Sequence, residues 1–150
     1  MPTDIQGIKM KTSARNQFPG TVSALNKGAV NAEVVLKLDD KSEIVAIITN
    51  ESIANLGLAV GKPAYALIKA SSVILMTDAS AKTSARNKLC GTVSKCREGA
   101  VNGEVVIALD GGKEIVSIIT NESIRSLGLK AGIPVCALIK ASGIILAVTE

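Results

Sequence analysis

The chain has 150 residues, of which 47% are hydrophobic and only 1% aromatic, and its formal net charge is +4. The positive charge suggests an anionic partner, whereas the absence of histidine removes the commonest general base and the commonest transition-metal ligand. No apolar run is long enough to cross a membrane, and residues 1–10 lack the hydrophobic core of a signal peptide. We therefore expect a cytoplasmic protein, not attached to a membrane, with a loose N-terminal tail over residues 1–10.

The remainder of the chain is an internal repeat. Residues 11–16 (KTSARN) recur as 82–87, residues 48–53 (ITNESI) as 119–124, and residues 66–71 (ALIKAS) as 137–142, all at one constant offset. The repeat predicts one domain over residues 11–77, a linker over 78–81 and a second domain over 82–150. It also serves as a filter, because a residue that does necessary work in a duplicated unit should tend to occur in both copies.

The sequence of each copy predicts a series of short strands and one helical turn. Residues 32–38 alternate apolar and polar side chains, and residues 44–48 form a near-continuous apolar strand. Thr49 stands where a helix N-cap would be, and Gly57 follows the helical residues as a C-terminal glycine. Two further strands are expected in the first copy, one that ends at Lys69 and a closing strand over residues 73–76. We expect an all-β protein of two tandem OB-like, five-stranded Greek-key barrels, each with one short helix.

The cysteines do not pass the repeat filter. Cys90, Cys96 and Cys136 have no cysteine counterparts in the first copy. An odd number of cysteines without a CxxC motif argues against a disulfide framework. We expect three small, buried side chains in a reducing compartment, with neither a disulfide nor a metal cation.

Few of the 17 cationic residues pass the filter. Lys11, Arg15 and Lys69 recur, and the hydroxyls of Thr49 and Ser52 recur beside a helix start. If the segment is extended, Ser13 and Arg15 share one face. These groups are all hydrogen-bond donors, which suits a fully deprotonated oxyanion such as molybdate, tungstate or sulfate. Ordinary surface ion pairs with nearby glutamates are an equally weighted alternative.

A second shared element is the sequence GAVN. Because glycine and asparagine tolerate positive φ, successive N–H groups could form an anion-binding nest there. A plain turn leading into a strand is the better alternative on physical grounds. The residues concerned are Gly28, Ala29, Val30 and Asn31, with Gly99, Ala100, Val101 and Asn102.

The order of these motifs along nearly the whole chain, twice, resembles the Mop (molybdopterin-binding-like) family, or molbindins, which have a TOBE-type OB fold. The resemblance implies molybdate, and tungstate with it, held at domain and subunit interfaces. It also implies a homotrimer of tandem chains. The implied main site comprises Ser13, Arg15, Thr49, Ser52, Ile53 and Lys69, with Ser84, Arg86, Thr120, Ser123, Ile124 and Lys140. The GAVN turns are the implied second site.

The leading hypothesis is therefore a protein that binds molybdate for storage or homeostasis and leaves it chemically unchanged. A basic OB fold that binds nucleic acid is the alternative, and its weakness is the lack of aromatic side chains on which bases could stack. Phe18 and Tyr65 are the only aromatic residues, and neither recurs in the second copy. An enzyme is not expected, because the usual acids, bases and nucleophiles are missing.

Overall fold

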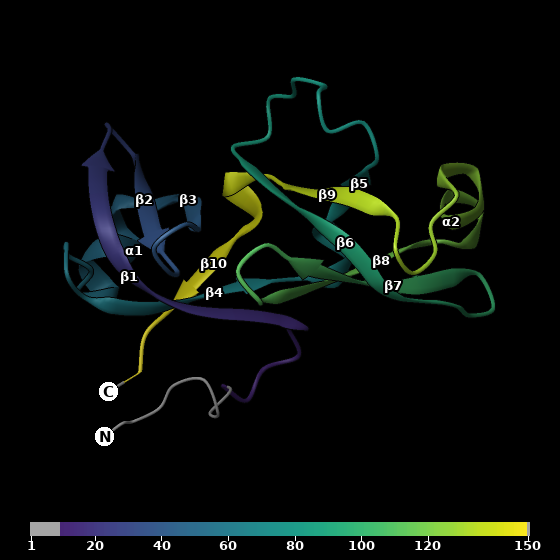
Figure 1. Cartoon of the computed structure of the whole chain (residues 1–150). Helices are drawn as coiled ribbons and strands as arrows, with labels where there is room; N and C mark the ends of the chain where they lie inside the picture. The colour runs from purple at the N-terminus through teal and green to yellow at the C-terminus, as the bar shows by residue number, and fades with distance from the viewer. Residues whose placement is uncertain (1–9, 150) are drawn as a thin grey trace. The chain divides into compact units, whose positions relative to one another are not determined.

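The computed structural model describes residues 10–149 (Figure 1). The N-terminal tail expected over residues 1–10 lies outside the described residues except for Met10, whose backbone N–H donates to Gln17 Oε1 at 2.9 Å. Within the described part of the chain, no helix is long and apolar enough to span a membrane.

Over residues 10–149 the chain forms ten strands, two α-helices and two short 3-10 helices. They are β1 (Asn16–Lys27), β2 (Asn31–Lys37), β3 (Glu43–Thr49), α1 (Asn50–Leu56), β4 (Pro63–Ile68), η2 (Ala70–Ser72), β5 (Ile74–Met76), β6 (Asn87–Glu98), β7 (Asn102–Leu109), β8 (Glu114–Thr120), α2 (Asn121–Leu127), β9 (Pro134–Ile139), η3 (Ala141–Gly143) and β10 (Ile145–Ala147).

The strands form two five-stranded antiparallel sheets with equivalent orders, β10-β4-β1-β2-β3 and β5-β9-β6-β7-β8. In each sheet the fourth strand of a repeat returns to lie beside its first, which is the order that defines a Greek key. The expected all-β fold, with one short helix in each of two repeats, is confirmed.

The closing strands are exchanged between the repeats. β5, from the first repeat, pairs with β9 of the second, and β10, from the second repeat, pairs with β4 of the first. The compact units are therefore unit 1, with described residues 10–68 and 141–149, and unit 2, Lys69–Lys140. They differ from the contiguous segments 11–77 and 82–150 expected from the repeat. A sequence repeat shows which segments are equivalent but not which copy of a strand completes which sheet.

A bulge bends the long first strand of each unit. The register of β1 on β2 shifts between Val22 and Ala24, and that of β6 on β7 shifts between Val93 and Lys95. The serine at each bulge donates its hydroxyl to a carbonyl of the neighbouring strand, Ser23 to Val35 at 3.3 Å and Ser94 to Val106 at 3.2 Å. The bend lets one half of the strand pair with the fourth strand and the other half with the second.

The predicted alternation of apolar and polar side chains determines which residues are buried in the core. Val34 and Leu36 in unit 1, and Val105 and Ile107 in unit 2, have no exposed surface, while Val35, between the first pair, is only half-buried. Both aromatic residues are also buried, Phe18 at 5% and Tyr65 at 8% exposure. Neither ring is therefore presented to solvent.

The cysteine expectation is wrong for two of the three residues. Cys90 and Cys136 form a disulfide, and Cys96 is a free, half-buried thiol. The two bonded residues are 46 positions apart but are direct cross-strand partners in the pairing of β6 with β9. Their separation in the sequence gave no sign of this contact. The cysteines therefore no longer argue for a reducing compartment.

This disulfide predicts the thiol count of the protein. Denatured, unreduced protein should react with one equivalent of a thiol reagent, and reduced protein with three. Reduction should also lower the free energy of unfolding, by about 2–4 kcal/mol, because the bond no longer restricts the unfolded chain. Three reactive thiols in protein purified without reductant would contradict the assignment, and a C96S variant provides the control.

Candidate functional site

The hydroxyls of the Thr-x-x-Ser segment cap the helix of each unit, as expected. Thr49 is the N-cap of α1, and its Oγ1 accepts the N–H of Ser52 at 3.0 Å and donates to Ser52 Oγ at 2.9 Å. Thr120 and Ser123 repeat both bonds at the same distances at the start of α2. Because Ser52 Oγ already accepts a bond from Thr49, its own hydrogen is directed away from the cap. The capping pair thus presents one outward hydroxyl donor.

The other backbone donors at the helix start are partly occupied. The N–H of Asn50 donates to the carbonyl of Val30 at 2.8 Å, and that of Asn121 to the carbonyl of Val101 at 2.8 Å. The side chains of Ile53 and Ile124 are buried in the core at 3% exposure each. Only the backbone of these isoleucines could contribute to a site.

The GAVN turns lie against these helix starts and do not form a nest. Among the described residues, positive φ occurs only at glycines other than Gly28 and Gly99, so the turn is the plain one favoured on physical grounds and not the left-handed nest. A Cβ at Gly99 would come within 2.7 Å of the Asn102 carbonyl oxygen, which accepts the Gly99 N–H, and a Cβ at Gly28 would come within 3.1 Å of that of Asn31. Val30 and Val101, 69% and 71% exposed, stand at the tips of the turns.

The KTSARN segments form bends that lead into the first strand of each unit. Thr12 Oγ1 accepts the N–H of Ala14 at 3.0 Å, and Thr83 Oγ1 accepts that of Ala85 at 3.2 Å. β1 begins only at Asn16, and residues 11–13 and 15 lie in bends, so the extended segment assumed for Ser13 and Arg15 is not found. Ser13, Arg15, Ser84 and Arg86 are all exposed at these bends.

Asn16 and Asn87 also belong to the repeated motif, and the sequence analysis did not select them. Each is only 3% exposed, and Asn87 Nδ2 donates to the carbonyl of Ile139, its cross-strand partner, at 3.2 Å. The next residues outward from this pair are Arg86 and Lys140. The recurrence of the asparagine in both copies was the signal available in the sequence, and its burial is what the structure adds.

The same register occurs in unit 1, where Asn16 pairs with Ile68. Arg15 precedes Asn16 in the sequence, and Lys69, the first residue of unit 2, follows Ile68.

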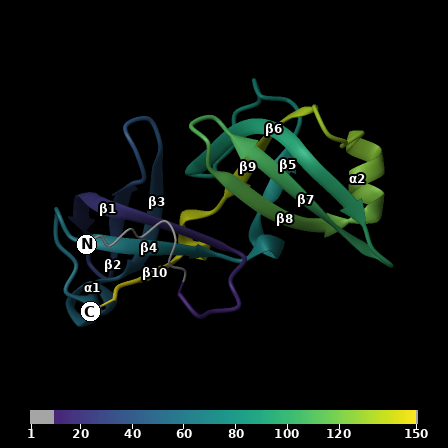
Figure 2. The same ribbon diagram turned by 60° about the horizontal axis from the view of Figure 1, so that its bottom comes forward.

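The predicted donors thus form two groups in unit 2, and their counterparts in the first repeat follow the same order along the sequence. The first, which we call the basic end, is at the start of the long strand and holds Ser84, Arg86 and Lys140 in unit 2. The second, the helix end, holds Thr120, Ser123 and the GAVN turn. Asn87 and Glu98 are the first and last residues of β6, about 35 Å apart along the strand at the usual rise per residue. Figures 1 and 2 both show α2 on the side where β6 ends.

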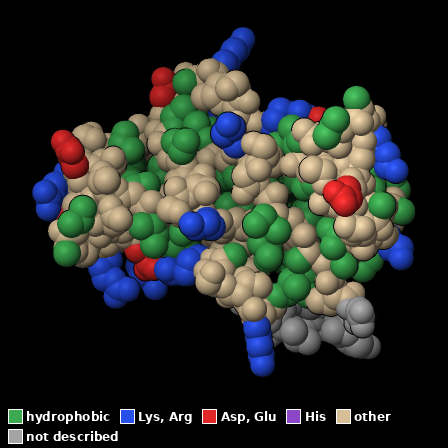
Figure 3. Space-filling model, turned by 180° about the vertical axis from the view of Figure 1, so that it is seen from behind, with side chains coloured by type: hydrophobic (Ala, Val, Ile, Leu, Met, Phe, Trp, Pro, Cys, Tyr) green, Lys and Arg blue, Asp and Glu red, His purple; other side chains and the backbone are tan. Residues whose placement is uncertain are grey.

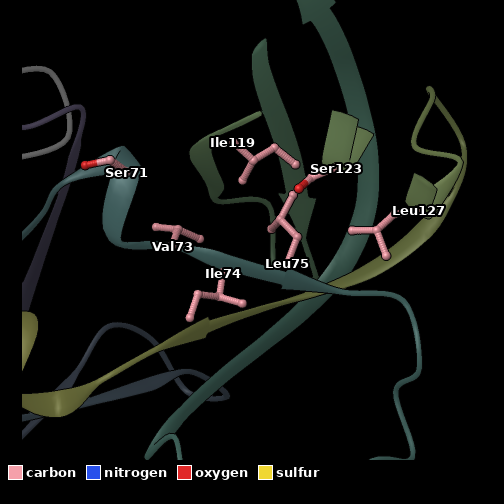
Figure 4. Close-up of a pocket in the computed structure, with 7 residues that line it drawn as sticks. All are labelled: Ser71, Val73, Ile74, Leu75, Ile119, Ser123 and Leu127. Atoms are coloured by element: carbon pink, nitrogen blue, oxygen red, sulfur yellow. The ribbon is translucent and has the colours of Figure 1, made fainter. Parts of the chain in front are cut away.

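Unit 2 also has a cavity of about 190 Å³ beside its helix end. Figure 4 shows Ser71, on η2, at one side of this cavity, and Ser123 and Leu127, on α2, at the other. The wall between them is apolar and includes Ile74 and Ile119. Ser71 recurs as Ser142 and lies only two residues after Lys69, but sequence reasoning did not select it.

The two helix ends differ in charge. Lys27 precedes the turn of unit 1, whereas Glu98 precedes that of unit 2 and pairs with Arg125 at 2.6 Å. The hydrogen bond from Arg125 to Glu98, with their charge attraction, raises the pKa of Arg125. Burial, and then the charge of Glu98, raise the pKa of the Cys96 thiol, so this cysteine is a poor nucleophile. Among residues 10–149, no group of three or more Cys, Asp or Glu side chains could hold a metal cation.

Comparison with known proteins gives the family. The TOBE domain model matches residues 12–75 and again residues 83–146. The chain belongs to the TOBE domain family, with two tandem copies of the domain. The resemblance found in the sequence is thereby confirmed.

Two similar proteins have names that refer to molybdenum. "Molybdenum transport protein ModE" of Azotobacter vinelandii is 48% identical over 144 residues, which are 96% of this chain and 53% of that protein. "Molybdenum-pterin-binding protein MopA" of Rhodobacter capsulatus is 44% identical over 141 residues, 93% of this chain and 53% of that protein. The chain spans about half the length of these curated relatives.

A solved structure matches along its full length. It is the cytoplasmic molybdate-binding protein ModG with molybdate bound, at 52% identity and a TM-score of 0.90, and the match covers 93% of this chain and 100% of that one.

The N-cap bonds give a prediction about stability. Replacing Thr49 and Thr120 with valine keeps the side-chain shape but removes the acceptor for the serine N–H. Each substitution should cost about 1 kcal/mol in the free energy of unfolding, measured by denaturant titration. Thr49→Ser and Thr120→Ser keep the hydroxyl and should stay close to wild type. Equal stability of the valine and serine variants would show that the cap contributes nothing.

Proposed function

We propose that this chain binds molybdate, and tungstate as the same class of dianion, and stores it in the cytoplasm without changing it chemically. The observation that carries the proposal is the ModG structure, in which a chain of 52% identity and the same fold along its full length holds molybdate. The repeated donor set supplies the chemistry, because charge-assisted hydrogen bonds from arginine, lysine and hydroxyl groups suit a dianion.

We further propose that the main site is completed between subunits. The basic end and the helix end lie at opposite ends of the long strand, too far apart for one anion to contact both within a unit. A complete donor set then needs the basic end of one copy and the helix end of another, which agrees with the expected homotrimer. Exposed apolar side chains that recur in both repeats, Val30 with Val101 and Ile74 with Ile145, are available for such contacts. Figure 3 shows hydrophobic side chains at the surface among lysines and arginines.

The nucleic-acid alternative gains no support from the described residues. Base stacking needs exposed aromatic rings, and Phe18 and Tyr65 are both buried. Several curated relatives are named as transcriptional regulators, but this chain matches only about half of their length.

Isothermal titration tests the proposed function. Molybdate, added to purified protein in sulfate-free buffer, should bind tightly with more than one anion per chain, because the donors occur twice. Sulfate and phosphate serve as controls and should bind much more weakly. No heat with molybdate, together with salt-dependent binding of a labelled oligonucleotide, would instead favour the nucleic-acid alternative.

A mixing experiment tests whether the site is shared. Variant A carries Arg15→Ala and Arg86→Ala, and variant B carries Ser52→Ala and Ser123→Ala. Each alone should bind molybdate weakly, since each lacks one half of every site. Oligomers formed by refolding A and B together should regain part of the wild-type binding, at contacts where B supplies the basic end and A the helix end. Mixed oligomers that bind no better than the separate variants would contradict the shared site.

A further inference from the structure

An asparagine joins the GAVN turn to the helix start in both units. Asn50 Nδ2 donates to the carbonyl of Gly28 at 3.0 Å, and Asn121 Nδ2 donates to that of Gly99 at 2.9 Å. The backbone N–H of each asparagine also bonds to the turn, as described above. Each asparagine therefore holds two of the turn's carbonyl groups and lies directly between the N-cap threonine and the residues that lead to the capping serine.

The connection between the strands is short and has no positive φ. The last ladder pairs before it are Lys27 with Ala32 and Glu98 with Gly103, so four residues, 28–31 and 99–102, form the connection in each unit. Connections of this length are most often built around a type I turn, which needs no positive φ, and Ala29, Val30, Ala100 and Val101 have none. Within the connection the N–H of Gly28 donates to the carbonyl of Asn31 at 2.8 Å, as that of Gly99 does to Asn102. The asparagine adds two further bonds from outside the turn.

The amide oxygen of this asparagine is expected to lower the stability of the protein. The amide oxygens of Asn50 and Asn121 are buried and accept no hydrogen bond. Asn121 is only 8% exposed. A buried acceptor without a partner is destabilising, yet both copies keep the amide and use only its donor side. The neighbouring Lys27 and Ala32, by contrast, have been replaced by Glu98 and Gly103 in the second copy.

We propose that Asn50 and Asn121 are positioning residues for anion binding. Each locks the GAVN turn to the Thr-x-x-Ser hydroxyls, so that the two candidate anion-binding segments of a helix end form one rigid element. This inference rests on the proposed function, since it assigns the asparagines a role in the same site. It also makes a claim about the unliganded protein, that the turn is ordered by its bond to the helix start.

The test compares Asn121→Ala with Ser117→Ala, a matched control in the same unit. Ser117 is fully buried and donates its Oγ to the carbonyl of Val73 at 2.8 Å, so both variants lose one side-chain bond to a backbone carbonyl. Hydrogen exchange without ligand should become faster at residues 100–102 in Asn121→Ala and stay unchanged there in Ser117→Ala. Molybdate titration should show about tenfold weaker binding at the affected sites only in Asn121→Ala.

Two further variants identify the atom responsible and guard against misfolding. Asn121→Asp keeps the acceptor oxygen but has no donor, and it should behave like Asn121→Ala; wild-type binding by the aspartate variant would overturn the role of Nδ2. Asn50→Ala repeats the test in unit 1, where the asparagine is only half-buried and the substitution disturbs the core less.

The outcomes separate the two proposals. If wild-type protein binds molybdate and both alanine variants at the asparagines bind it equally well, the positioning role is wrong and the proposed function stands. If wild-type protein binds no molybdate, the proposed function fails, and hydrogen exchange alone decides whether the turn is locked. Equal exchange at residues 100–102 in Asn121→Ala, Ser117→Ala and wild type would overturn the locking.

Discussion

The bend in the first strand of each unit is the constraint on which the other features depend. One strand of twelve residues pairs with the fourth strand along its first half and with the second strand along its second half. At the bulge, where the strand changes from one neighbour to the other, the hydroxyl of Ser23 donates to a carbonyl of the second strand. Because the strand serves two neighbours, its start and its end are held at opposite ends of the sheet. The separation of the basic end from the helix end follows directly.

The interior of each unit could be predicted from local patterns. Alternation over residues 32–38 gave the buried face, and a threonine before a polar helical turn with a glycine after it gave both helix caps. These features depend on residues that are close in the sequence, and the same pattern occurs in both copies of the repeat. The proposed donor residues were selected by the same repeat, because most of the cationic residues do not recur in the second copy.

Other features depend on contacts between distant segments, which local patterns do not contain. The bond between Cys90 and Cys136 follows from the register of β6 on β9, and the roles of Asn16 and Asn87 follow from the same ladder. The GAVN turn is the plain turn that physical grounds favoured over a nest, because glycine and asparagine permit positive φ without requiring it. Here the glycine is needed for close approach of a carbonyl, and the asparagine at the helix start, outside the turn, sets its geometry.

The exchange of closing strands has a consequence for how the chain holds together. The loop between β5 and β6 joins the repeats, but it is not what completes the sheets. If a protease cut this loop, the N-terminal piece would still supply β5 to the sheet of unit 2, and the C-terminal piece would still supply β10 to the sheet of unit 1. The pieces would be interlocked, since neither could leave without opening both sheets. Fusion of the repeats into one chain also makes each closing strand always available, independently of protein concentration. A cut in this loop is therefore expected to leave both five-stranded sheets complete.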